Sequence, residues 1–509
     1  MRYVELATTR AEVAAHRGRK AKVARLAALL TAAAPDERAV IARHLSGELG
    51  HTLGAGYAAV AALRGATAAA EPSLTVGEVE AQLAAVAALA GPGSQQARRA
   101  ALAALFAAAT ADEQGLLADL IVGEVRQGAL AALLVDAAAL ASGVPEAAVR
   151  AAYMLAGEVG VVVAAALTDG ADGVARFTLA LFRPILPMLA QTADDPAAAL
   201  VALGGRASFE PKLDGFRVQV HRDGAVVRAY SRLGNDVSAS VPEVLAAIAA
   251  LPVRRLIVDG EALGLGDDGR PLPFQDTMRR KSAAGGPLAL ALFDLLLVDD
   301  DVLLATPAAD RHARLAALAP TLAVPRVVTD DPAVAAQVYA DALAAGHEGV
   351  MAKALDAPYQ AGARGAAWLK IKKVHRLDLV VLAAEWGSGR RRGWLSNLHL
   401  GARDGDGWAM LGKTFKGLTD ATLRWQTEAL LARETGRDAH VVHVRPELVA
   451  EIEFNDVQRS TRYPSGFALR HARVVRYRDD KRAADADTLD AVRALARADG
   501  LLTGDDVAR

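Results

Sequence analysis

Residues 212–215, Lys-Leu-Asp-Gly, are the first candidates for chemistry in this chain. The residues that follow alternate, with apolar Phe216, Val218 and Val220 separated by polar residues, which predicts a half-buried strand. A lysine just ahead of a paired sheet is well placed to react, because positive neighbours or burial help such an amine to lose its proton. A single Lys-x-Asp-Gly is more often an exposed turn, so the rest of the chain must decide.

Four apolar segments further along carry charged or aromatic residues and predict strands. They are residues 256–261, 290–294, 347–353 and 368–372. The first predicts a buried strand that ends in acids, with Asp259 and Glu261 two apart and therefore on one face. Taken singly, such residues are typical of strand ends, a protein core or a solvated sheet edge.

Taken together, these segments supply what nucleotidyl transfer needs. They offer a nucleophile, two acids able to hold Mg²⁺, an aromatic ring for stacking on a base, and two lysines for phosphates. These are, in that order, Lys212, Glu261, Glu348, Phe293, Lys370 and Lys372. A metal and cations neutralise the charge that develops on phosphates, and Mg²⁺ takes few protein oxygens and completes its shell with water and phosphate.

Composition limits the classes of protein that remain. A chain of 509 residues with 52% hydrophobic and 23% charged residues predicts about two to four soluble domains. The net charge of −1 provides no global field, so nucleic-acid binding would need local basic patches. Cysteine is absent, which excludes disulfides, thiolate zinc sites and a cysteine nucleophile. The chain shows neither a signal-peptide core nor a membrane span, so we expect a cytoplasmic protein without membrane contact.

The order of patterns predicts three domains. Residues 1–176 have helical periodicity, residues 177–376 mix strands with helices, and residues 377–509 show short strands joined by Gly-rich and basic turns, which suits a small barrel that grips a nucleic-acid backbone. Within the helical part, residues 45–49 and 121–125 are similar and hint at two related halves, although coincidence is about as common in an alanine-rich chain. The turn at residues 126–128, Arg-Gln-Gly, could bind a phosphate.

Five ordered segments resemble the motifs of the covalent nucleotidyltransferases. Residues 212–217 resemble motif I, 259–261 motif III, 292–294 motif IIIa, 348–353 motif IV and 368–372 motif V. Five motifs in the right order are highly specific, whereas any one would be weak. The whole chain resembles the ATP-dependent DNA ligases of the bacterial type. The resemblance implies an all-α DNA-binding domain, an α+β adenylation domain and a β-barrel OB-fold domain.

The same resemblance implies the reaction and its participants. The expected function is sealing of nicks in double-stranded DNA, in replication, repair and recombination, through a lysyl-AMP intermediate on Lys212. ATP is the expected substrate and Mg²⁺ the expected metal. The protein is expected to act as a monomer in the cytoplasm, in association with the nucleoid.

The resemblance also implies roles for individual residues. Glu210 would read the adenine, Phe293 would stack on it, Glu261 would hold the ribose or a metal, and Glu348 would hold a metal. The expected phosphate ligands are Arg217, Arg232, Arg364, Lys370 and Lys372. Arg470 and Lys481 resemble a last motif that assists the first step. His471 and Ala472 depart from the Phe-Pro common in eukaryotic versions, which leaves the role of Arg473 open.

Other classes stay open from the residues alone. An mRNA capping guanylyltransferase or an RNA ligase shares the lysine chemistry, but neither is expected to carry so large a helical domain ahead of the lysine. An NAD-dependent ligase is disfavoured because its zinc module needs cysteines. The intact set of lysines and acids argues against an inactive DNA-binding relative.

Overall fold

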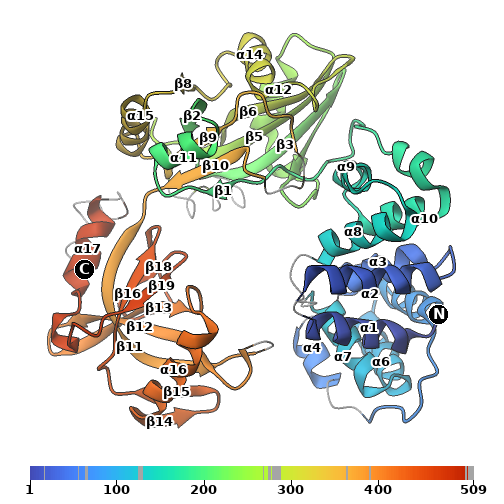
Figure 1. Ribbon diagram of the computed structural model, residues 1–509, viewed down its shortest axis with the longest axis horizontal. Helices are drawn as coiled ribbons and strands as arrows, with labels where there is room; N and C mark the ends of the chain where they lie inside the picture. The colour runs from blue at the N-terminus through green and yellow to red at the C-terminus, as the bar shows by residue number, and fades with distance from the viewer. Residues whose placement is uncertain are drawn as a thin grey trace.

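The computed structural model describes residues 1–16, 18–54, 57–63, 67–123, 130–266, 269–272, 277, 288–360, 362, 365–388, 391–498 and 501. Figure 1 shows three units along the chain: a helical part, a central part of strands and helices, and a strand-rich part. The predicted fold classes are confirmed for all three.

The helical part packs around one apolar core. Its helices are α1 (Tyr3–Ala15), α2 (Arg19–Ala32), α3 (Arg38–Ser46), α4 (Tyr57–Leu63), α5 (Val76–Ala88), α6 (Ser94–Ala108), α7 (Ala111–Ile121), α8 (Leu130–Ser142), α9 (Glu146–Ala156) and α10 (Val159–Ala175). Leu26 and Leu30 of α2, one helical turn apart, are both buried in that core, as the helical period predicts. Within the described residues, no helix is long and apolar enough to span a membrane.

The described parts of the two similar segments, residues 45–49 and 121–123, each begin at the end of a helix, whereas the sequence suggests that each opens a new helix. Gly47 directly follows the end of α3 at Ser46, and Gly123 lies two positions after the end of α7 at Ile121. Both glycines have positive φ, 85° and 68°, which favours glycine because it lacks a Cβ. The turn at residues 126–128 lies outside the described residues.

The central part contains two five-stranded sheets. Its strands are β1 (Gln191–Thr192), β2 (Ala207–Pro211), β3 (Phe216–Asp223), β4 (Val226–Ser231), β5 (Arg255–Gly264), β6 (Leu288–Val298), β7 (Asp301–Val302), β8 (Val327–Thr329), β9 (Gly349–Lys353) and β10 (Trp368–Lys372). One sheet has the order β1-β10-β9-β2-β8 and the other β4-β3-β5-β6-β7. Its helices are α11 (Pro196–Ala202), η1 (Ser238–Ser240), α12 (Pro242–Ala249), α14 (Ala308–Leu318) and α15 (Pro332–Ala344).

The chain passes from one sheet to the other at residues 212–215, between β2 and β3. Two details differ from the sequence prediction. The dipeptide Asp223-Gly224 predicts a two-residue hairpin turn, but Asp223 pairs with Val226, so the turn consists of residues 224 and 225, one position later. The strand β5 does not end at Glu261 but continues to Gly264, because β6 pairs with it along its length.

The strand-rich part is a curled antiparallel sheet of the OB type. Its elements are β11 (His375–Trp386), β12 (Leu395–Asp404), β13 (Gly407–Thr414), α16 (Asp420–Leu431), β14 (Glu434–Asp438), β15 (Val441–Val444), β16 (Val449–Phe454), β17 (Val457–Arg459), β18 (Phe467–Leu469), β19 (Arg473–Tyr477), η3 (Ala483–Asp485) and α17 (Leu489–Ala498). The strand β11 is long and pairs with β12, β15 and β16, which curls the sheet.

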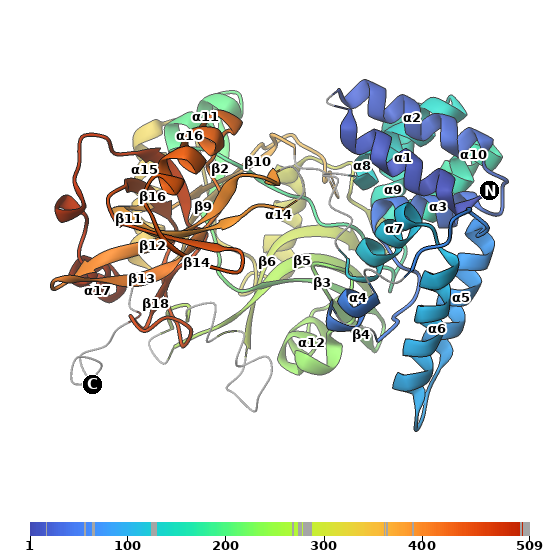
Figure 2. The same cartoon turned by 90° about the horizontal axis from the view of Figure 1, so that it is seen from below.

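The helical part and the OB part lie at opposite ends of the molecule. Figure 1 shows the central part at the top, with the OB part below it on the left and the helical part below it on the right, and Figure 2 shows the two sheets between these parts. The OB part nevertheless reaches the centre, because Arg470, which follows β18, contacts Asp214 of the central part.

Candidate active site

A cavity of about 740 Å³ lies between the two sheets of the central part, and Lys212 lines it. The backbone holds this lysine on both sides. The N–H of Lys212 donates to the carbonyl of Gly349 at 2.8 Å, and the N–H of Glu348 donates to the carbonyl of Lys212 at 3.3 Å. The nucleophile candidate is therefore fixed to the start of β9, beside Glu348, which immediately precedes that strand.

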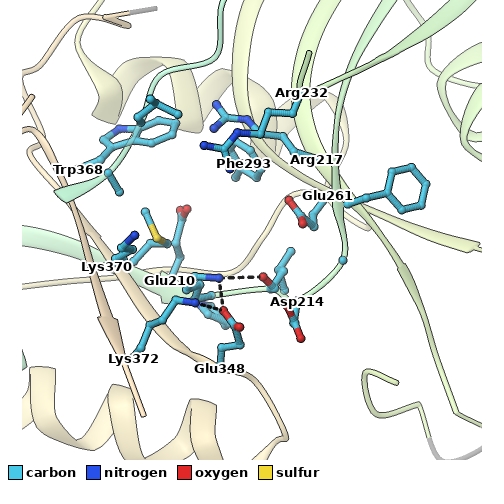
Figure 3. A pocket seen from close by; sticks show the side chains of 18 of the residues that line it. Glu210, Asp214, Arg217, Arg232, Glu261, Phe293, Glu348, Trp368, Lys370 and Lys372 are labelled. Atoms are coloured by element: carbon cyan, nitrogen blue, oxygen red, sulfur yellow. Dashed lines mark hydrogen bonds and ion pairs between the residues drawn. The ribbon is translucent and has the colours of Figure 1, made fainter. Parts of the chain in front are cut away.

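Charged groups from four segments of the chain meet at one end of the cavity. The Nζ of Lys212 forms a close ion pair with Glu348, and the Nζ of Lys372 lies 2.9 Å from the same carboxylate. Arg470 donates from Nη1 to Oδ2 of Asp214 at 3.0 Å and to Oε1 of Glu348 at 3.2 Å. Figure 3 shows Asp214, Glu348 and Lys372 gathered at this end.

These contacts set the ionisation of the acids. Burial alone would raise the pKa of Glu348, but the ammonium groups of Lys212 and Lys372 lower the pKa to about 2. Burial and the neighbouring Glu348 raise the pKa of Asp214, although Arg470 opposes the shift. Burial and the charge of Lys212 lower the pKa of Lys372. Glu348 is thus a carboxylate at neutral pH and the anionic centre of the cluster.

The other end of the cavity is more enclosed. Glu210 is buried and forms a close ion pair through Oε1 with Lys353, whose Nζ lies 5.0 Å from the centre of the Phe293 ring and 4.5 Å from that of Trp368. The second carboxylate oxygen of Glu210, Oε2, is buried without a hydrogen-bond partner among the described residues. This end of the cavity offers an aromatic ring beside an unused acceptor, which suits a flat heterocycle that carries an amino group.

Glu261 and Arg217 also line the cavity, but their surroundings differ. Burial raises the pKa of Glu261 to about 7, although Lys212 and Arg217 oppose the shift. Arg217 forms a bidentate pair with Asp259, with Nε–Oδ1 at 2.9 Å and Nη2–Oδ2 at 2.5 Å. Its remaining Nη1 donates to the carbonyl of Met188 at 2.7 Å. With its donors engaged in this way, the expected role of Arg217 as a phosphate ligand stays a prediction.

The remaining predicted residues divide into three cases. Lys370 and Arg232 line the cavity. Arg364 lies outside the described residues. Lys481 does not line the cavity; its Nζ lies 2.5 Å from Asp378 of β11. Of the two residues assigned to the last motif, only Arg470 therefore reaches the site.

Several lining residues were missed as site residues. Asp214, Lys353 and Trp368 lie within segments that resemble motifs I, IV and V, but neither the residues nor the resemblance assigns them an individual role. The alternation in β10 places Trp368, Lys370 and Lys372 on one face, which could have indicated the tryptophan. Met188, Leu189 and Ala190, which also line the cavity, carry no such signal, because they lie in an aperiodic segment.

The acids of the cavity fit a magnesium ion that is held largely by substrate. Among the described residues, no group of three or more His, Cys, Asp or Glu side chains could enclose a metal. An ionised Glu348 and the nearby Glu261 would supply one or two oxygens, and phosphate and water would supply the rest, which is how Mg²⁺ is usually bound with nucleotides.

A lysine fixed in a cavity between two sheets, with an OB-fold arginine reaching into it and a helical domain beyond, defines a covalent nucleotidyltransferase built from three domains. Comparisons with known proteins narrow this class. Residues 187–372 match the ATP dependent DNA ligase domain, residues 391–481 the ATP dependent DNA ligase C terminal region, and residues 54–139 the DNA ligase N terminus.

Relatives match along nearly the whole chain. A probable DNA ligase of Anaeromyxobacter dehalogenans strain 2CP-C is 56% identical and covers 97% of this chain and 99% of its own. A probable DNA ligase of Mycolicibacterium gilvum strain PYR-GCK is 53% identical with the same coverage. This chain belongs to the ATP-dependent DNA ligases. A solved structure named Pmar-Lig_PreS3 shares the fold, with 18% identity, a TM-score of 0.60, and coverage of 93% of this chain and 99% of its own.

Proposed function

We propose that this ligase seals nicks in duplex DNA through an AMP adduct on Lys212. The observation that carries the proposal is the backbone of Lys212 fixed between two sheets, with its amine in the cavity beside Glu348. The amine would attack the α-phosphorus of ATP and expel pyrophosphate. AMP would then pass to the 5′-phosphate of the nick, and the 3′-hydroxyl would attack that phosphate and expel AMP. Positioning and charge are what such phosphoryl transfers need from the protein.

The charged residues of the cavity would share the phosphates. Lys370, Lys372 and Arg232 face the cavity and would contact phosphate oxygens, and we extend the same role to Arg364 from its motif. Glu348 and Glu261 would hold Mg²⁺. The metal, when bound, neutralises charge on the phosphates and on the leaving pyrophosphate. Arg470 would add positive charge from the OB domain during the first step.

The base would be selected at the enclosed end. Adenine presents an amino group where guanine presents a carbonyl oxygen. The unpartnered Oε2 of Glu210, as a carboxylate oxygen, can accept a hydrogen bond from that amino group but cannot pair with a carbonyl oxygen. Phe293 would stack on the ring. We expect adduct formation with ATP and little with GTP, and we expect Glu210→Ala to reduce this preference.

The wider setting of the activity is inferred from the family. We propose that the protein acts as a monomer on nicked chromosomal DNA in the cytoplasm, in replication, repair or recombination. We also propose domain limits of 1–176 for the helical DNA-binding domain, 177–376 for the adenylation domain and 377–509 for the OB domain.

The decisive experiment is the mass of the protein after incubation with ATP and Mg²⁺. The parent chain should gain one AMP and Lys212→Ala should gain none, whereas the control Lys413→Ala, a lysine of the OB sheet paired with Glu385, should gain it normally. An adduct on Lys212→Ala at normal yield would mean that the nucleophile is wrongly assigned. Parallel assays with nicked DNA and nicked RNA then decide the polymer, and sealing of RNA alone would overturn the proposed substrate.

A further inference from the structure

Residues 182–190 form an extended strap between the helical domain and the two sheets. No helix or strand is formed here, and Phe182 has a positive φ of 63°. The strap matters because its end is part of the nucleotide pocket: Met188, Leu189 and Ala190 line the same cavity as Lys212. Aperiodic chain has no ladder of its own, so its position depends on side chains that bind its backbone.

Two buried residues of β3 hold the first half of the strap. The Oε1 of Gln219 accepts from the N–H of Ile185 at 2.9 Å, and its Nε2 donates to the carbonyl of Ile185 at 3.2 Å. The N–H of Phe182 donates to Nδ1 of His221 at 2.9 Å, so the ring proton lies on Nε2, which faces Oε1 of Gln219 at 2.9 Å. Gln219 therefore satisfies both backbone groups of Ile185 and also orients His221.

The second half of the strap is held from another direction. The N–H of Met188 donates to the hydroxyl of Tyr359 at 3.1 Å, and the carbonyl of Met188 accepts from Arg217 at 2.7 Å. Gln219, Arg217 and His221 alternate along β3 and so share one face, which the strap covers. Leu186 lies between the two sets of anchors, and its N–H donates to the carbonyl of Met154 at the end of α9.

We propose that Gln219 is a positioning residue for ATP binding, which fixes the strap so that Met188 to Ala190 form a wall of the nucleotide pocket. The proposal rests on the assignment of this cavity as the nucleotide site. It gives Gln219 a role without any contact to substrate, since Gln219 itself does not line the cavity. The same strap connects the pocket to the helical domain through Leu186 and α9.

The test is Gln219→Met, which keeps the approximate volume and removes all three hydrogen bonds. Adduct formation is followed against ATP concentration in the full-length chain, and sealing is followed separately with enzyme that already carries AMP. We expect the KM for ATP to rise on the order of tenfold, with the limiting adenylation rate and the sealing rate changed by less than about twofold. Gln219→Glu, which loses the donor to the carbonyl of Ile185 and buries a charge opposite Asp259, should raise the KM as well.

The control is Val220→Ala, a buried neighbour on the opposite face of β3 that packs in the sheet core and does not touch the strap. It lowers stability in the same strand, so a KM that rises as much in Val220→Ala as in Gln219→Met would overturn the proposal, as would an unchanged KM in Gln219→Met. If Gln219→Met does not fold, Tyr359→Phe removes the anchor of the Met188 N–H and should raise the KM in the same direction; an unchanged KM there counts equally against the strap.

A failure of the strap is distinguishable from a failure of the pocket assignment. If Lys212→Ala still forms the adduct, the cavity is not the adenylation site, whatever the variants of Gln219 do. If Lys212→Ala is inactive and the Gln219→Met enzyme binds ATP normally, only the role of the strap is lost.

Discussion

Glu348 is the acid that gathers the positive charges of the site. Lys212, Lys372 and Arg470 all contact its carboxylate, and the three come from different segments of the chain. A buried carboxylate and its cationic partners stabilise one another, because removing any one of them leaves a buried charge without its partner. The position of the lysine amine therefore depends on Glu348 as well as on the backbone.

Replacing this acid should disable the first step. We expect Glu348→Gln to reduce the rate of adduct formation by about a hundredfold or more, because the amine loses its partner and the phosphates lose a metal ligand. Extra Mg²⁺ should restore little. The control is Glu385→Gln, since Glu385 also pairs with a lysine and a histidine but lies in the OB sheet away from the cavity. Equal rates of adduct formation in Glu348→Gln and Glu385→Gln would show that Glu348 has no role in the first step.

The raised pKa of Glu261 gives a prediction for stability against pH. Its pKa rises from 4.5 to about 7 on folding, so the folded protein keeps a proton that the unfolded chain loses in that interval. The contribution of Glu261 to the free energy of unfolding is therefore complete below pH 4.5 and is lost as the pH rises through 7. The total loss is roughly 3 kcal/mol. Glu261→Gln should therefore be more stable than the parent at pH 8 and nearly equal at pH 4.5, as measured by denaturant unfolding, while it loses adenylation.

At the scale of secondary-structure elements, the close approach of neighbouring strands positions Lys212. A Cβ on Gly215 would lie 2.2 Å from the carbonyl oxygen of Ala262 on β5, and one on Gly349 would lie 2.1 Å from that of Ile371 on β10. Gly349 also has a φ of 144°. These two glycines flank Lys212 in space, so both sheets come close to the reacting amine only because these positions lack a side chain.

A methyl group at the first of these positions should separate β3 from β5. We expect Gly215→Ala to lower the free energy of unfolding by about 1–3 kcal/mol and to abolish most adduct formation. Gly436→Ala is the matched control, because a Cβ at Gly436 in β14 meets no atom within 4 Å. Normal adduct formation by Gly215→Ala would show that the strands can separate without moving the lysine.

The individual strands of the site could be predicted from the sequence, but their pairing with one another could not. Strands β3, β5, β6, β9 and β10 follow from alternation and apolar runs, and the ordered motifs indicate which side chains belong together. The pairing of β2 with β9, which brings Glu348 to Lys212, is not local and has no signal in either strand. The sequence indicates a connector at residues 168–188, which includes most of the strap. It does not indicate what holds that connector in place, because the hydrogen bonds come from Gln219 and His221 of β3.

At the scale of the whole molecule, the helical domain should supply most of the grip on DNA. A chain starting near residue 177 keeps the cavity residues and should still form the adduct, yet it should seal nicks poorly and only at low salt, because fewer phosphate contacts release fewer counterions. Adduct yield and sealing are compared for the short and full chains across a salt series. Equal sealing at physiological salt would leave the helical domain without this role.

Arg470 of the OB domain contacts Asp214 of the central domain, 256 positions earlier in the sequence. We expect Arg470→Ala to slow adduct formation by about tenfold or more, because a positive charge is lost beside the phosphates, while sealing of DNA that already carries AMP changes much less. Arg473→Ala is the control: its side chain is exposed and its nearest acid, Glu453, lies 3.8 Å away. A loss of sealing equal to the loss of adduct formation would contradict this division.

The contact of Arg470 with Asp214 and Glu348 also has a consequence for the kinetic order of the substrates. While it holds, Arg470 and His471 form part of the cavity wall, and we expect the OB domain to cover the side from which a nick approaches Lys212. We therefore expect ordered binding of the substrates, with nucleotide first and polymer second, because an OB domain held in this position would keep ATP and DNA from binding together. Nicked DNA added before ATP should therefore inhibit formation of the AMP adduct, although the same DNA is the substrate of the later steps.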